Sequence, residues 1–67
     1  MEIRLIDLRQ NCKIIGDTSE LPIPKIGERV FIDYSPAPKV LDVLYFFDDK
    51  FVAIKLDGYF GEIKWLN

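Results

Sequence analysis

Hydrophobic and polar residues follow a strand-like pattern along residues 40–57, and this pattern predicts a β-hairpin. Both arms are rich in β-branched and aromatic residues, and the acidic pair Asp48-Asp49 separates them. A two-residue loop at this pair places Phe46 opposite Phe51 and gives both arms a common apolar face. A three-residue loop mixes charged residues with apolar ones on that face, so we favour the two-residue loop. The residues expected to face the core are Leu41, Val43, Tyr45, Val52, Ile54 and Leu56.

The other face of this hairpin is also largely apolar, and two interpretations of it remain open. It pairs Asp42 with Lys55 beside Leu44, Phe46, Phe51 and Ala53. In the first interpretation, which we favour, the N-terminal strand covers these residues and they form part of the core. In the second, they form an exposed patch, which in a small domain marks a surface for a partner or for self-association.

The dipeptide Asp57-Gly58 predicts a second tight turn, because a type I′ turn requires positive φ at both of its central residues. The hairpin then continues into a three-stranded antiparallel meander over residues 40–66. In this arrangement Tyr59 and Trp65 face the core side, whereas Phe60 faces outward.

The first half of the chain predicts shorter elements. Residues 2–9 are expected to form a strand with a bulge near Leu5-Ile6, where the alternation changes phase; a short amphipathic helix is the competing interpretation. Residues 12–15 predict a short returning strand. Two prolines within residues 16–26 predict an extended loop, and residues 28–34 predict another strand, followed by a second proline loop. The fold class is therefore all-β, a small five-stranded antiparallel barrel in a single domain over residues 1–67.

Two short motifs resemble sequences found in small β-barrels. Residues 25–32 are similar to the glycine turn and strand that open many small bacterial barrels. Residues 58–63 are similar to the Gly-x-x-Gly-x-Ile sequence that precedes the last strand of Src-homology-3-like domains. The chain lacks that family's Ala-Leu-Tyr-Asp-Tyr opening, its Trp-Trp pair and its Pro-x-x-Tyr ending. The resemblance therefore implies a barrel and does not imply recognition of proline-rich peptides.

Composition narrows the class of protein. The chain has 67 residues with 49% hydrophobic residues, as a very small globular core requires, and this content argues against disorder. Nine basic and eleven acidic residues form no basic stripe, so binding to nucleic acid is disfavoured. A single cysteine excludes an internal disulfide, and no apolar run is long enough to span a membrane. We expect a cytoplasmic protein with no membrane association.

The inventory of reactive side chains argues against an enzyme. The sequence has no histidine, which excludes Ser-His and Cys-His pairs and histidine-based metal sites. Cys12 has basic neighbours at Arg9 and Lys13, but a small apolar role is the favoured interpretation. Adjacent carboxylates at Asp48-Asp49 are typical of a turn, and neither a metal ion nor another cofactor is expected.

The sequence therefore predicts a non-catalytic binding module, an accessory protein of a bacterium or phage that mediates protein–protein interaction or self-association as a homo-oligomer. A nucleic-acid- or ribosome-associated small barrel is the alternative, and it depends on fold analogy alone. The identity of the partner is open. The candidate residues for binding a partner are Tyr34, Leu44, Phe46, Phe51, Phe60 and Trp65.

Overall fold

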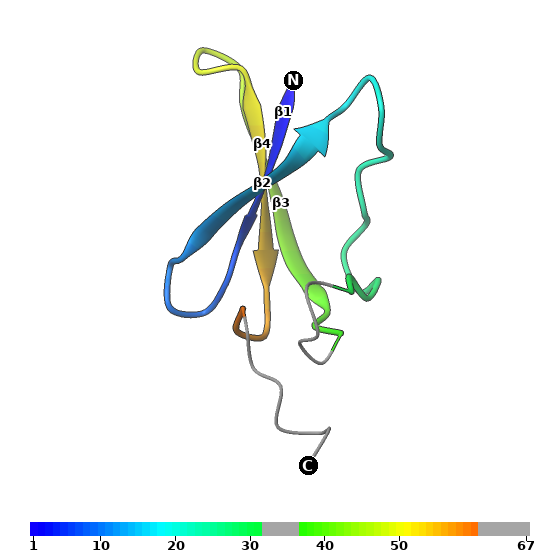
Figure 1. Ribbon diagram of the computed structural model, residues 1–67, viewed down its shortest axis with the longest axis vertical. Helices are drawn as coiled ribbons and strands as arrows, with labels where there is room; N and C mark the ends of the chain where they lie inside the picture. The colour runs from blue at the N-terminus through cyan, green and yellow to red at the C-terminus, as the bar shows by residue number, and fades with distance from the viewer. Residues whose placement is uncertain (32–36, 61–67) are drawn as a thin grey trace.

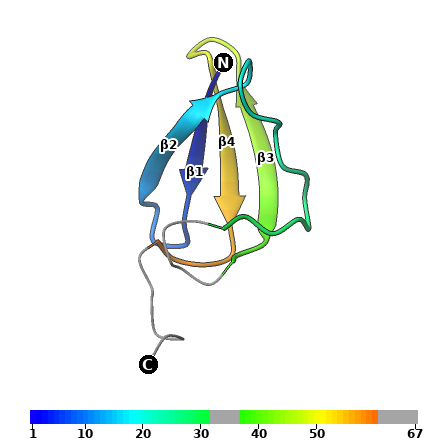
Figure 2. The same ribbon diagram turned by 45° about the vertical axis from the view of Figure 1, so that its right-hand side comes forward.

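The protein is all-β in the part that the computed structural model describes, residues 1–31 and 37–60 (Figure 1). The described residues form four strands: β1 (Glu2–Ile6), β2 (Cys12–Asp17), β3 (Val40–Phe46) and β4 (Phe51–Leu56). These strands make one mixed sheet in the order β2-β1-β4-β3, which Figure 2 shows with the four strands side by side. Strands β1 and β2 are antiparallel, as are β3 and β4, whereas the central pair β1 and β4 is parallel.

The predicted hairpin of residues 40–57 is present, and its register is confirmed over most of its length. Phe46 pairs with Phe51, and the pairing continues in step to Asp42 and Lys55. The connection has four residues outside the strands, 47–50, and Lys50 takes the left-handed conformation with φ of 57°. Four-residue hairpin loops are built around a type I turn and leave the same register as a two-residue loop would.

The hairpin departs from prediction at the start of β3. The register shifts between Val40 and Asp42, so that Val40 rather than Leu41 pairs with Leu56. Leu41 is therefore the extra residue of a β-bulge and is half exposed, whereas Val40 is buried in the core. Local alternation does not reveal this, because Val40 and Leu41 are both apolar.

Residues 2–9 form a strand rather than a helix, but the strand ends at Ile6. The bulge expected near Leu5-Ile6 lies instead in the partner strand: Ile3 pairs with Gly16 and Arg4 with Ile14, which leaves Ile15 as the extra residue. The change of phase after Leu5 has another cause, since the chain turns after Ile6.

The position of β1 corrects two of the predictions. Strand β1 lies beside β4 in the same sheet, with Ile3 next to Val52 and Leu5 next to Ile54. It therefore extends the sheet sideways and does not cover the outer face of the hairpin. Strand β1 also occupies the edge of β4 that the meander required, so that pairing is wrong for Tyr59 and Phe60, and the rest of the expected strand lies outside the described residues.

The chain after β4 does not make the expected type I′ turn. Gly58 has no positive φ, and its carbonyl accepts a hydrogen bond from the Leu8 amide at 3.0 Å. A Cβ atom on Gly58 would lie 2.9 Å from Pro38 Cβ, so close contact with Pro38 explains the glycine. Residues 61–67, including Trp65, lie outside the described part of the chain.

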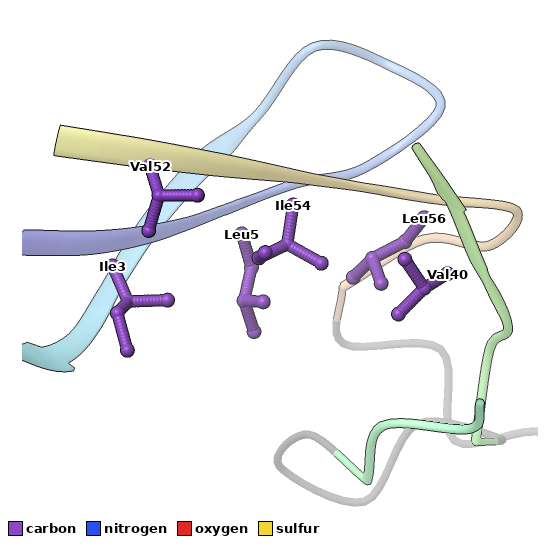
Figure 3. Packing of buried hydrophobic residues seen from close by; sticks show 6 residues of the cluster. All are labelled: Ile3, Leu5, Val40, Val52, Ile54 and Leu56. Atoms are coloured by element: carbon purple, nitrogen blue, oxygen red, sulfur yellow. The ribbon is translucent and has the colours of Figure 1, made fainter. Parts of the chain in front are cut away.

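The hydrophobic core lies on one side of the sheet. Its six buried side chains, which Figure 3 shows together, are Ile3, Leu5, Val40, Val52, Ile54 and Leu56. Partly buried residues that pack against them include Ile23 and Val30 from the segment 18–31, which runs along one side of the sheet in Figure 1, and Phe60. The segment contains turns at residues 18–20 and 26–27 and both prolines of the predicted extended loop. The core is therefore a single sheet covered by irregular chain.

The prediction of a five-stranded antiparallel barrel is wrong for the described residues, which form an open four-stranded mixed sheet. Of the strand expected over residues 28–34, the described residues 28–31 contain an isolated bridge between Arg29 and Lys39, extended by hydrogen bonds between Val30 and Pro38 and between Val40 and Glu28. Residues 32–36, which include Tyr34, lie outside the described part.

Candidate interaction surface

The side of the sheet opposite the core is the most distinctive surface of the described structure. The strand registers place residues from all four strands on this side in three rows. The apolar members are Cys12 and Ile14 from β2, Ile6 from β1, Phe51 and Ala53 from β4, and Leu44 and Phe46 from β3. We call this surface the open face, because neither the segment 18–31 nor Phe60 packs on it; both pack on the core side.

Two phenylalanines form the aromatic end of the open face. The rings of Phe46 and Phe51 stack with 4.6 Å between their centroids and 13° between their planes. The guanidinium of Arg4 lies 3.9 Å from the centroid of the Phe51 ring, and its Nε donates to Glu2 Oε1 at 2.5 Å. Phe46 lies on β3, Phe51 on β4 and Arg4 on β1, and each contacts the next. The three side chains therefore form a stack across three neighbouring strands.

The open face keeps a large part of its apolar surface in contact with solvent. Phe46 is 41% exposed and Ile14 is 58% exposed, whereas Ala53 in the middle of the face is 0% exposed. Ala53 is small and lies between Arg4 on β1 and Leu44 on β3, whose longer side chains flank it. Exposed apolar residues are common singly, whereas Leu44, Phe46, Phe51 and Ala53 adjoin one another on β3 and β4 and form a candidate contact surface, which Arg4 separates from Ile14.

The charged residues of the open face balance one another. Arg4 forms its ion pair with Glu2, and Asp42 stands directly opposite Lys55 in the register of β3 and β4. Two basic and three acidic side chains therefore lie among the apolar residues of this face, the third acid being Asp17, which pairs with the N-terminal ammonium at 3.4 Å. A face of this kind offers no concentrated positive charge for a phosphate backbone.

The candidate residues chosen from the sequence lie in different places. Leu44, Phe46 and Phe51 lie together on the open face. Phe60, which the sequence placed outward, packs against the core on the opposite side. Tyr34 and Trp65 lie outside the described residues.

Sequence reasoning missed the half of the open face that β1 and β2 contribute: Ile6, Cys12 and Ile14. The reason is that residues 2–9 were expected to lie over the hairpin and not beside it. The available signal was the pattern of residues 2–6, in which Ile3 and Leu5 alternate with charged residues, as in a strand with one buried side and one solvated side.

The buried acid of the described structure has a structural role. Asp7 is 2% exposed and accepts hydrogen bonds from the amides of Arg9 at 2.9 Å, Asn11 at 2.8 Å and Phe60 at 3.1 Å. Its second contact with Asn11, from Nδ2, is 3.1 Å long. Burial raises the pKa of this carboxyl, but these hydrogen bonds outweigh burial and hold the pKa below its usual value. Asp7 therefore joins the β1–β2 turn to the chain after β4.

Other places for chemistry are limited. Cys12 is exposed, and no group of three or more potential metal ligands occurs within residues 1–31 and 37–60. On the core side, a groove of about 490 Å³ lies between the proline segment and β3. Its lining is Ile23, Pro24, Lys25, Ile26, Val43 and Tyr45. This groove is apolar and contains no pair of reactive groups.

No family model, curated protein or solved structure matches this chain. The described residues contain no helix with the length and apolar composition needed to cross a membrane. The surface itself is therefore the basis for any functional proposal.

Proposed function

We propose that this chain is a non-catalytic protein-interaction module and that the open face is its binding surface. The observation on which this depends is the apolar patch of Leu44, Phe46, Phe51 and Ala53 on β3 and β4, which contains the Phe46–Phe51 stack. Burying aromatic rings gives protein interfaces much of their binding energy, and a neutral polar surround suits a protein surface better than a nucleic acid.

The cross-linking test compares two neighbouring phenylalanines. A photoreactive benzoyl-phenylalanine is introduced at Phe46, on the open face, or at Phe47, in the turn. Phe47 is a matched control because it is 74% exposed and stacks on Tyr45, whose strand position is on the core side, at 5.8 Å. Circular dichroism establishes that each variant is folded before irradiation in cells.

We expect protein adducts from position 46 at several times the yield from position 47. We also expect Leu44→Ser, which changes a neighbouring residue of the face, to reduce the yield from position 46. Equal yields from both positions, or adducts made mainly with nucleic acid, would contradict the proposal.

A further inference from the structure

We infer that the occupant of the open face is a second copy of this chain, so that two sheets pack face to face as a symmetric sandwich. This inference rests on the proposed use of the open face for binding. The contact is isologous, because each copy presents the same surface to the other.

The layering of the molecule favours a second sheet. Stable domains bury both hydrophobic faces of a sheet by packing at least two layers together. Here the core side is covered by the segment 18–31 and Phe60, whereas the described residues place no layer over the apolar side chains of the open face. A second copy supplies a sheet of the same width, and two sheets pack about 10 Å apart in an aligned sandwich.

The edges of the sheet favour association through the face. Each of the two edge strands contains a bulge, at Ile15 in β2 and at Leu41 in β3. In β3 the carboxylate of Asp42 also accepts a hydrogen bond from the Val43 amide at 2.9 Å. Bulges and charged residues are devices that prevent edge strands from pairing with other chains. Joining two sheets edge to edge is therefore disfavoured, which leaves the open face as the surface through which two copies can associate.

The charge pattern matches a second copy. The open face has three acidic and two basic side chains, with Glu2 bonded to Arg4, Asp42 opposite Lys55 and Asp17 paired with the N-terminal ammonium. A strongly basic or acidic partner would gain nothing from this arrangement, whereas another neutral apolar face suits it. The net charge of −2 per chain causes little repulsion between copies at physiological salt.

A dimer of standard size would bury a modest share of the surface of this chain. A standard specific interface buries about 800 Å² on each partner. That area is about a sixth of the accessible surface of the chain, 4654 Å². We therefore expect a reversible dimer rather than a large obligate one.

The unique thiol makes the inference testable on the unmodified chain. Cys12 is the single cysteine of the sequence, is exposed, and lies on the open face opposite Ile6. The first measurement is mass by light scattering and sedimentation across a wide concentration range. The second is the rate at which a maleimide reacts with Cys12 over the same range. We expect the mass to rise from 7.8 kDa to twice that value and the thiol to become protected in parallel.

Three variants separate the open face from other surfaces. Phe46→Ser is expected to weaken the dimer by about tenfold or more, because aromatic residues dominate interface energetics. Phe47→Ser is the matched control and leaves dimerisation unchanged. In the double variant Cys12→Ala with Glu20→Cys, the thiol moves to an exposed position after β2, and its reactivity is expected to stay independent of concentration.

The outcomes distinguish this inference from the proposed function. A strict monomer at every concentration overturns the second-copy inference, as does a dimer that Phe46→Ser leaves intact. If a monomer still gives position-46 adducts with a different protein, the interaction module remains while the second copy is excluded. If position 46 gives no more adduct than position 47 and the chain is monomeric, both proposals fail.

Discussion

At the scale of single residues, Asp7 is the polar side chain on which the fold depends most. Its carboxylate accepts hydrogen bonds from three amides and one side chain, and these donors lie both in the β1–β2 turn and after β4. Asp7→Asn replaces one acceptor oxygen by a donor group. We expect it to lower the free energy of unfolding at pH 7 by about 1–3 kcal/mol, measured by urea denaturation. The exposed Asp49→Asn is the control and is expected to have little effect.

The same residue predicts how stability depends on pH. The folded pKa of Asp7 lies below the unfolded value of about 3.9, so its contribution is present above that value and is lost as pH falls through the folded pKa. We expect wild type to lose more stability than Asp7→Asn between pH 6 and pH 2. Parallel stability curves for the two proteins would contradict this role. Asp17, whose pKa is lowered chiefly by its hydrogen bonds from Ser19, is common to both proteins and cancels in the comparison.

At the scale of elements, the β3–β4 loop contains a testable backbone conformation. Lys50 has φ of 57°, which costs a residue with a Cβ atom about 1–2 kcal/mol, whereas glycine adopts it readily. Glycine also loses more entropy on folding, by about 0.5–1 kcal/mol. We therefore expect Lys50→Gly to stabilise the protein by up to about 1 kcal/mol in thermal or urea unfolding. Asp49→Gly, at a position without positive φ, should instead destabilise it.

The elements also show which parts of the fold the sequence determines locally. The hairpin register from Asp42–Lys55 to Phe46–Phe51 was predictable, because alternation and turn chemistry act over a few residues. The parallel pairing of β1 with β4 was not, since it joins residues about 50 positions apart and any apolar strand could fill that place. The turn at Asp57-Gly58 was misread because Gly58 is required by contact with Pro38 rather than by positive φ.

The difference between local and long-range strand pairing also explains which parts of the candidate surface could be predicted from the sequence. The sequence brought Leu44, Phe46 and Phe51 together because one hairpin contains all three. The sequence did not decide whether these three side chains are exposed, because their exposure depends on whether β1 lies over the hairpin or beside it. Because β1 lies beside β4, strands β1 and β2 add Ile6 and Ile14 to the same side of the sheet. The open face is therefore four strands wide, twice the width of the hairpin alone.

At the scale of the whole molecule, the two sides of the sheet should respond differently to substitution. Ile54 is fully buried on the core side, so Ile54→Ala should cost about 2–5 kcal/mol of stability. Phe46→Ser removes a partly exposed ring and its stacking on Phe51, so in dilute solution it should cost only about 1 kcal/mol. Urea denaturation at low protein concentration measures both, and equal losses would place Phe46 in the core.

Association through the open face makes stability itself depend on concentration. If two folded chains bind each other and unfolded chains do not, the folded state gains free energy by mass action. Above the dissociation constant, each tenfold rise in concentration then adds about 0.7 kcal/mol per chain, because one dimer gives two unfolded chains. For a domain of 67 residues this raises the unfolding temperature by roughly 3–6 °C per tenfold step. Phe46→Ser should reach a given unfolding temperature only at a protein concentration at least about ten times higher than wild type needs, whereas Phe47→Ser should follow wild type. A wild-type unfolding temperature that stays constant from micromolar to millimolar concentration would show that dimerisation contributes nothing to stability, and the open face would then be free in the isolated protein.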